Sequence, residues 1–197
     1  MIIVVFTIKN FKNWFVQIFY FVTLSYMKAI CVLTNVSDPN ISGYIEFEEV
    51  QVSKNGRKNL KITVNVEGLS PGLHGFHIHQ SGDLRKGCGS LCAHFNPDNT
   101  LHGDINDPRI HRHAGDLGNI KANKKGIVKK TFYDKILRLS GKYNIIGRSV
   151  VIHQDEDDLG LGGLDIYGNI IDPEKYNESR LTGNAGARIA CGVIGIL

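Results

Sequence analysis

The sequence predicts an all-β domain that carries two long loops. Apolar and polar residues alternate with a period of two along many short stretches, which is the pattern of half-buried strands. Glycine is frequent, at 22 of 197 residues, and Val, Ile and Thr fill many short runs. That composition suits short strands joined by glycine turns. We find no convincing amphipathic helix and no sequence repeat.

The clearest strand pattern covers Leu60–Val66, where every second residue is apolar. Asn123–Gly126 reads as a hairpin connection between two strands. The other expected strands cover 30–33, 43–48, 74–79, 118–122, 127–132, 136–139, 149–153 and 187–192. Two stretches, 82–118 and 154–186, break this rhythm. Long irregular loops in a compact domain usually carry function or bind something that orders them. We therefore expect a bound metal to order both loops.

Residues 1–26 differ from the rest of the chain. They contain no acidic residue, and their mostly apolar run, Trp14–Tyr26, is shorter than the roughly 20 residues that span a bilayer. No signal-type cleavage site follows that run. We therefore divide the chain into an extension, 1–26, and a domain, 27–197. Three interpretations of the extension stay open. It is a flexible or dispensable segment upstream of a start at Met27, it is a signal peptide or membrane-associating leader, or it is a part of the fold. A start at Met27 favours the cytoplasm, whereas a leader implies secretion or membrane association.

Charge and cysteine usage exclude several classes of protein. The formal net charge is +4 and no long basic run occurs, which argues against nucleic-acid binding. The four cysteines form no C-x-x-C pair, so neither a zinc ribbon nor a disulfide-dense scaffold is indicated.

All eight histidines lie between His74 and His153. His77 and His79 end an apolar strand pattern, and their spacing of two places both imidazoles on one face of the strand, able to reach one ion. Such a pair alone is a weak signal, because paired surface or core histidines are the common alternative. His153 ends another apolar strand and would complete a set of imidazoles, which suits copper.

A second set of metal ligands falls within the first long loop. Three imidazoles and a carboxylate make a sensible tetrahedral zinc site, and the loop supplies His94, His102, His113 and Asp116. His111 competes with His113 for this site, but only His113 has the H-x-x-D spacing to Asp116. His74 is expected to satisfy backbone groups near the barrel.

Two segments resemble the signatures of copper/zinc superoxide dismutases. They are Gly75–Asp83 (GFHIHQSGD) and Gly183–Gly192 (GNAGARIACG), and the similarity extends from about Lys28 to Leu197. The resemblance implies an eight-stranded Greek-key β-barrel, or immunoglobulin-like sandwich. It also implies an enzyme that converts superoxide to oxygen and hydrogen peroxide with a copper ion bridged through a histidine to zinc.

Carried over residue by residue, the resemblance also implies the roles within the site. Asp157 would link His77 to His102, Arg188 would attract and align superoxide, and Cys88 and Cys191 would form a disulfide. His94 would bridge the ions and, with Arg188, act in catalysis. The copper ligands would be His77, His79, His94 and His153, and the zinc ligands His94, His102, His113 and Asp116.

Further expectations concern the two remaining cysteines and the binding partners. Cys31 is expected to be a buried free thiol, and Cys92 a spare thiol where relatives more often have a small residue. We expect a homodimer built from Gln80–Gly82, Ile145–Gly147 and the C-terminal apolar residues, although Gln80 and Ser81 depart from the usual pattern there. A copper chaperone is a further possible partner.

Two other functions compete with an active dismutase. One is a metal-delivery protein like the dismutase-like domain of a copper chaperone, and the other is a silent dismutase-like binding protein. Both would ordinarily lack site residues, whereas this chain keeps its histidines, both aspartates and Arg188, which favours activity.

The approach to copper departs from the family pattern. Two positions where relatives commonly carry lysine hold Asp155 and Leu181, and 154–181 contains eight acidic residues against Lys175 and Arg180, a local charge of −6. We hypothesise that the electrostatic steering of superoxide toward copper depends on Arg188 and Arg180. The catalytic rate should then fall only weakly as ionic strength rises.

Overall fold

The computed structural model describes residues 2–7, 17–22, 27–33, 39–52, 56 and 58–197. Within the predicted extension, β1 (Ile2–Thr7) and β2 (Gln17–Val22) pair antiparallel in a sheet of their own. Residues 14–16 and 23–26 of its apolar run lie outside the described residues, so the boundary at Met27 stays a prediction. No helix in the described ranges is long and apolar enough to cross a membrane.

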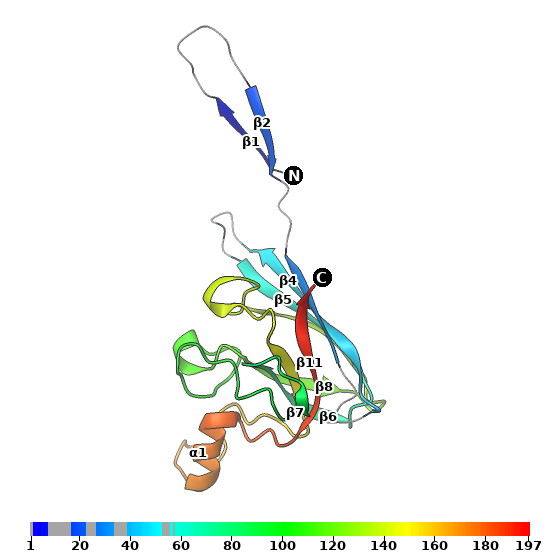
Figure 1. The fold of residues 1–197 in the computed structure, drawn as a ribbon. Helices are drawn as coiled ribbons and strands as arrows, with labels where there is room; N and C mark the ends of the chain where they lie inside the picture. Colours follow the sequence, from blue (N-terminus) through cyan, green and yellow to red (C-terminus); the bar gives the residue numbers. More distant parts are fainter. Residues whose placement is uncertain (1, 8–16, 23–26, 34–38, 53–55, 57) are drawn as a thin grey trace.

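Eight antiparallel strands form a nearly closed barrel, which confirms the predicted all-β fold (Figure 1). Their spatial order is β8-β6-β10-β11-β3-β4-β5-β9, so strands distant in sequence are neighbours, as in a Greek key. The strands are β3 (Lys28–Val32), β4 (Ser42–Gln51), β5 (Lys58–Glu67), β6 (Gly72–His79), β8 (Asp116–Ala122), β9 (Val128–Asp134), β10 (Ser149–His153) and β11 (Arg188–Ile196).

The barrel interior is built from the apolar residues of the predicted alternation. In β5, Leu60, Ile62 and Val64 are fully buried, while the residues between them are partly exposed. Phe76 and Phe132 meet edge to face inside the barrel, with ring centroids 6.3 Å apart. Burying each such side chain contributes about 1.5–3 kcal/mol. β10 is buried along its whole length, because the loops cover its outer face.

The strand predicted over 136–139 is wrong. The chain turns after β9 because the Asp134 carboxylate accepts the N–H groups of Ile136 and Leu137, the first at 2.7 Å. Only an isolated bridge between Arg138 and Asn144 follows. The turn at Asn123–Gly126 does join β8 to β9, although β8 pairs with β6 and β9 pairs with β5.

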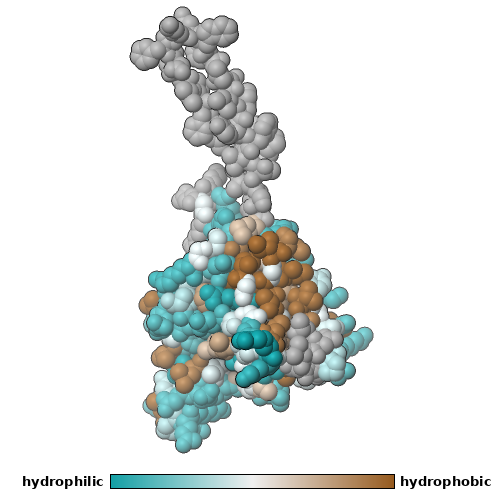
Figure 2. All heavy atoms as spheres, in the orientation of Figure 1, coloured by the Kyte–Doolittle hydropathy of each residue, from teal (hydrophilic) through white to brown (hydrophobic). Residues whose placement is uncertain are grey.

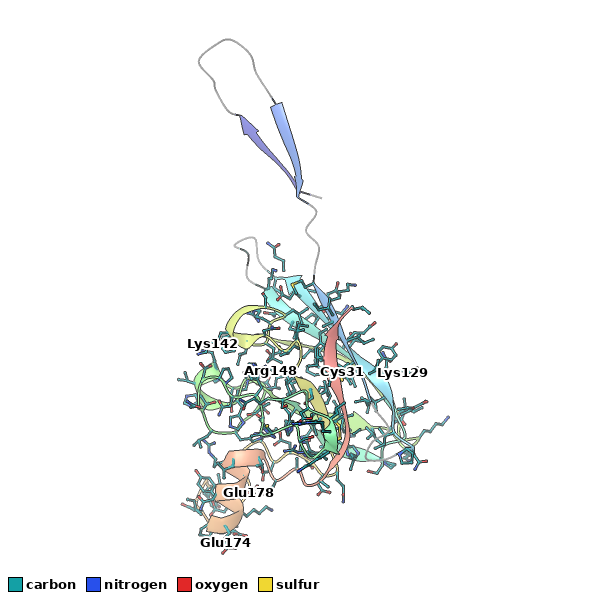
Figure 3. The ribbon with its side chains drawn as sticks, viewed as in Figure 1. Cys31, Lys129, Lys142, Arg148, Glu174 and Glu178 are labelled. Carbon is teal, nitrogen blue, oxygen red and sulfur yellow. A yellow bond between two sulfur atoms is a disulfide. The ribbon has the colours of Figure 1, made fainter. Side chains whose placement is uncertain are left out.

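The second long loop contains a helix that the sequence analysis missed, α1 (Pro173–Thr182). Asp172 caps its N-terminus by accepting the N–H of Lys175 at 3.0 Å, and Gly183, with φ +74°, ends it in the left-handed conformation. Figure 3 shows Glu174 and Glu178 on this helix, at the end of the barrel away from the N-terminal strands.

The first long loop is fastened to the barrel at two points. The sequence analysis missed the short strand β7 (Arg85–Cys88), which ends at a disulfide between Cys88 and Cys191 of β11. Arg112 is buried and forms an ion pair with Asp134 of β9. The predicted disulfide is therefore present, and Cys31 is free and buried while Cys92 is free and exposed, as expected.

Candidate metal centre

Neighbouring strands bring together histidines that are far apart in the sequence. β6 supplies His77 and His79, and β10, which pairs with β6, ends at His153. The first loop adds His94, whose backbone pairs with that of His79 in an isolated β-bridge. One ligand atom from each of these four side chains lies within 4.8 Å of the others, and all four side chains are buried.

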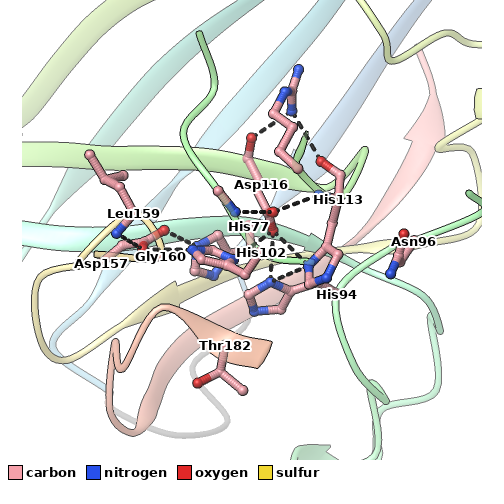
Figure 4. Close-up of polar contacts among 12 residues, drawn as sticks. His77, His94, Asn96, His102, His113, Asp116, Asp157, Leu159, Gly160 and Thr182 are labelled. Atoms are coloured by element: carbon pink, nitrogen blue, oxygen red, sulfur yellow. Dashed lines mark hydrogen bonds and ion pairs between the residues drawn. The ribbon is translucent and has the colours of Figure 1, made fainter. Parts of the chain in front are cut away.

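A second cluster adjoins the first through His94 (Figure 4). The Asp116 Oδ1 atom lies 2.8 Å from His94 Nδ1, 3.1 Å from His102 Nδ1 and 3.1 Å from His113 Nδ1. His77 also lies within 4.8 Å of the ligand atoms of His94, His102 and Asp116. The loop residues predicted for zinc thus converge on one carboxylate oxygen.

In four of the rings a hydrogen bond fixes one nitrogen and leaves the other nitrogen facing the clusters. Asp157 accepts from His77 Nε2 at 2.7 Å and from His102 Nε2 at 2.8 Å. His79 Nδ1 bonds to the Cys92 carbonyl oxygen at 2.9 Å, and His153 Nδ1 to that of Gly186 at 3.1 Å. These bonds set the ring orientations, as they do around metal ions in general.

The nitrogens that remain are buried and have no hydrogen-bond partner in the described part of the chain. They are His77 Nδ1, His79 Nε2, His102 Nδ1 and His153 Nε2. Buried polar atoms are nearly always paired, and an unpaired one costs about 1–3 kcal/mol. A set of convergent unpaired imidazole nitrogens therefore fits metal ions, with nitrogen ligands that suit copper and the nitrogen–carboxylate set that suits zinc.

Burial keeps the first cluster in the neutral form that binds metals. It lowers the pKa of His77 to about 3 and that of His153 to about 4, because a buried imidazolium loses its hydration. Burial also lowers the pKa of His102, but the nearby Asp116 carboxylate and the hydrogen bond to Asp157 outweigh it and raise that pKa to about 10. The carboxylates of Asp116 and Asp157 thus favour positive charge beside His102, consistent with a dication site there.

Gly183 allows Asp157 to reach both rings. A Cβ at Gly183 would lie 2.2 Å from Asp157 Oδ1 and 2.5 Å from His102 Nε2, closer than any side chain can pack. Asn119 holds the Asp157 backbone from the other side, with its amide donating to the Asp157 carbonyl at 2.8 Å. Sequence reasoning did not assign Asn119 a role, although it stands three residues after Asp116.

An open cleft of about 530 Å³ leads to the first cluster. His79, His94 and His153 line it, together with Arg188. The Arg188 guanidinium is fixed by donating to the Cys88 carbonyl at 2.8 Å and to the Cys92 carbonyl at 2.7 Å. A cation is therefore held beside the histidines at the position that the sequence analysis expected.

Helix α1 forms one wall of this cleft. Its lining residues are Glu178, Leu181 and Thr182, and Arg180 is not among them. The backbone oxygen of Arg180 accepts the N–H of His102 at 2.8 Å, and its Nε is buried. Arg180 therefore lies outside the cleft lining, and its part in steering superoxide stays a prediction that the Arg180→Ala variant tests.

The two histidines left without a metal role lie as expected. His74 is buried, with Nδ1 2.9 Å from the His153 carbonyl oxygen and Nε2 2.9 Å from that of Ser70. His111 is exposed, whereas His113 contacts Asp116.

Sequence reasoning missed Ser179, which is buried. Its hydroxyl donates to Asp158 and so holds α1 against the start of the second loop.

Comparisons with known proteins point the same way as this geometry. A family model for copper/zinc superoxide dismutase matches residues 41–194. The Cu-Zn superoxide dismutase of Paramecium bursaria Chlorella virus 1 is 47% identical over 174 residues, which cover 88% of this chain and 82% of that protein. The Cu-Zn superoxide dismutase 3 of Arabidopsis thaliana is 42% identical over 170 residues, or 86% and 91% of the two chains.

An extracellular relative and a solved structure extend these matches. The extracellular Cu-Zn superoxide dismutase of Drosophila melanogaster is 51% identical over 139 residues, which cover 71% of this chain and 69% of that protein. The crystal structure of the clock protein EA4 superposes with a TM-score of 0.73 at 39% identity, covering 90% of this chain and 99% of that one.

Proposed function

Because the chain belongs to the copper/zinc superoxide dismutase family, it converts superoxide to oxygen and hydrogen peroxide with copper and zinc, and we propose which residues do so. Copper is held by His77, His79, His94 and His153, and zinc by His94, His102, His113 and Asp116. The observation that carries this assignment is the position of His94. Its Nδ1 contacts Asp116, while its ring centroid is 4.0 Å from that of His77 and 5.0 Å from that of His79.

His77 is assigned to copper alone. Its Nε2 is engaged by Asp157, which leaves only Nδ1, and one nitrogen lone pair binds one ion. His94 is the ring that serves both ions, because each of its two nitrogens can carry a lone pair when the ring is deprotonated. Asp157 positions a ring of each site and so couples the geometry of the copper ligands to that of the zinc ligands.

Copper supplies one-electron redox chemistry, and zinc supplies a positive charge that holds and polarises the bridging imidazole. Arg188 binds the superoxide anion through its charge and its N–H groups, in a position fixed by two backbone carbonyls. His94 holds a proton at Nε2 in one half of the cycle and gives it to the reduced product in the other.

Metal analysis joined to an activity assay tests this function. A fully loaded sample is expected to contain one copper and one zinc per chain and to accelerate superoxide decay. A sample that holds zinc but cannot bind copper would overturn the assignment.

We expect the catalytic rate to fall only weakly as ionic strength rises. The described charges at the cleft are those of Arg188 and Glu178, with exposed Asp155 packed against Gly186 at the rim. Long-range steering changes association rates by about 10–1,000-fold and is screened by salt. The Asp155→Lys/Leu181→Lys double variant should therefore be faster at low salt and steeper in its salt dependence.

Arg180→Ala is the matched control, because Arg180 lies outside the cleft lining. Its rate-against-salt curve should follow that of the wild type. A wild-type slope as steep as that of the lysine variant would contradict the prediction.

We also propose a homodimer, with a copper chaperone as a possible further partner. The three segments that form the proposed interface lie side by side: Gly147 donates to the Ile194 carbonyl at 2.9 Å, and a Cβ at Gly82 would touch Gly147 and Val193. Ile196 is 70% exposed, and Figure 2 shows apolar surface gathered over the C-terminal end of β11. Such a patch marks an interaction site on a soluble protein.

Sedimentation at micromolar concentration should give twice the chain mass of 21.9 kDa. Ile196→Glu is expected to shift the protein toward monomer, because it places a charge in the interface. Ile166→Glu alters a still more exposed isoleucine on the second loop and should leave the mass unchanged. A monomeric wild type would count against the dimer.

A further inference from the structure

The cleft contains an exposed thiol that the metal assignments leave unused. Cys92 is free and lines the same cleft as His79 and His153. Both of these histidines are more than nine-tenths buried, and their Nε2 atoms lack a hydrogen-bond partner in the described residues. A soft sulfur ligand thus stands at the entrance to a cluster of imidazoles that fits copper.

The backbone role of Cys92 does not explain its side chain. Its carbonyl oxygen accepts from His79 and from Arg188, which any residue could provide. Its φ of +63° lies in the left-handed region, which glycine adopts without strain and other residues rarely occupy. The position therefore keeps a strained cysteine where glycine would serve the backbone better.

Cys92 is not a resident ligand of either ion. It belongs to neither group of side chains whose ligand atoms lie within 4.8 Å of one another. A thiol that lies near the copper site but is not one of its final ligands can bind a copper ion only transiently. Thiolates prefer Cu(I) to Zn(II) or to oxygen-seeking cations, so copper(I) is the ion that this side chain selects.

We propose that Cys92 is a copper-entry residue: its sulfur takes Cu(I) from a soluble thiolate complex and passes the ion to the imidazoles of the cleft. This inference rests on the copper-site assignment proposed above. Arg188, which we assign to superoxide binding, donates to the Cys92 carbonyl at 2.7 Å and so holds the Cys92 backbone at the cleft.

The transfer is a ligand exchange without a redox step. Cys92 Sγ forms a bond to copper as the bond to the donor thiolate breaks, and the proton of Cys92 moves to the departing thiolate. Copper then leaves Cys92 Sγ for His79 Nε2 and His153 Nε2, and the sulfur takes up a proton from solvent. Copper remains Cu(I) throughout.

The test measures copper uptake by the zinc-loaded, copper-free full chain under anaerobic conditions. Cu(I) complexed by glutathione is mixed with the wild type, Cys92→Ser, Cys92→Gly and Cys31→Ala. Uptake is followed by timed separation and copper analysis, and by the near-ultraviolet absorbance of a copper–sulfur bond. Cys31→Ala is the matched control, because it removes the buried free thiol.

We expect both Cys92 variants to load at least about ten-fold more slowly than the wild type, since an ion held beside its site acts at a millimolar effective concentration. The final copper content should be the same in all four proteins. The Cys92→Gly variant separates the thiol from backbone strain, because glycine relieves the strain. Equal loading rates in the wild type and both Cys92 variants would overturn the inference.

A trapping experiment separates this inference from the copper-site assignment. In His79→Ala/His153→Ala, the copper–sulfur absorbance should persist, because the receiving imidazoles are gone, and the further change Cys92→Ser should remove it. An absorbance independent of Cys92 would overturn the entry role. Full copper retention in His79→Ala/His153→Ala/Cys92→Ser, where neither the thiol nor the two imidazoles remain, would instead overturn the proposed copper ligands.

Discussion

Replacing His153 with alanine is expected to remove copper and abolish superoxide dismutation while the zinc content stays near its wild-type value. His153 Nε2 points into the first cluster without another partner, and the ring does not contact Asp116. Loss of a direct ligand should lower copper affinity by more than the roughly 10–100-fold that loss of an outer hydrogen-bond partner costs. Elemental analysis and superoxide-decay rates on the same sample measure both effects.

His111→Ala is the matched control for this substitution. His111 is exposed and lies on the first loop close to zinc ligands in sequence, yet it is outside both clusters. The variant should keep both metals and full activity. If His153→Ala lost zinc together with copper while remaining folded, the two sites would not be separable in the way that we propose.

The barrel strands could be predicted because each buries one face. The alternation in Leu60–Val66 reflects a strand with an apolar inner side and a polar outer side. Three of the four residues 136–139 are also apolar, but they pack in a turn in which the Asp134 carboxylate accepts backbone N–H groups. Short apolar runs do not distinguish a strand from such a turn. Helix α1 escaped detection because it is largely exposed and has no apolar face; only its cap, Asp172-Pro173, and Gly183 signalled it.

Residue spacing alone predicted the site as a set of ligands but not as an arrangement. Histidine spacing indicated two groups of metal ligands, whereas the contacts of Asp157 with His77 and His102 could be expected only from the family resemblance, because they depend on segments that the folded barrel brings together. The position of Arg180 shows the same limit. Successive residues of a helix point about 100° apart, so Leu181 lines the cleft while its neighbour Arg180 does not, a difference that the order of residues alone does not reveal.

Removing the Cys88–Cys191 disulfide is expected to lower the free energy of unfolding by about 4–5 kcal/mol in the chain-entropy model. The bond joins residues 103 apart in sequence, so it restricts a large part of the unfolded chain. Cys88→Ala/Cys191→Ala is the appropriate variant, because both sulfurs lie in a buried apolar cluster with Leu91 and Val151, where a serine hydroxyl would be unsatisfied. Denaturant unfolding of the metal-free protein measures the change.

The same variant should also lose activity, because the disulfide holds the loop whose carbonyl groups fix Arg188. Without it, the Cys88 carbonyl that accepts from Arg188 at 2.8 Å is no longer tied to β11, and the guanidinium loses its fixed position beside the copper ligands. Wild type treated with a reductant provides a comparison without cavities, and Cys31→Ala controls for loss of a buried thiol. Peptide mapping that found Cys92 joined to Cys191 in the wild type would contradict the pairing on which this prediction depends.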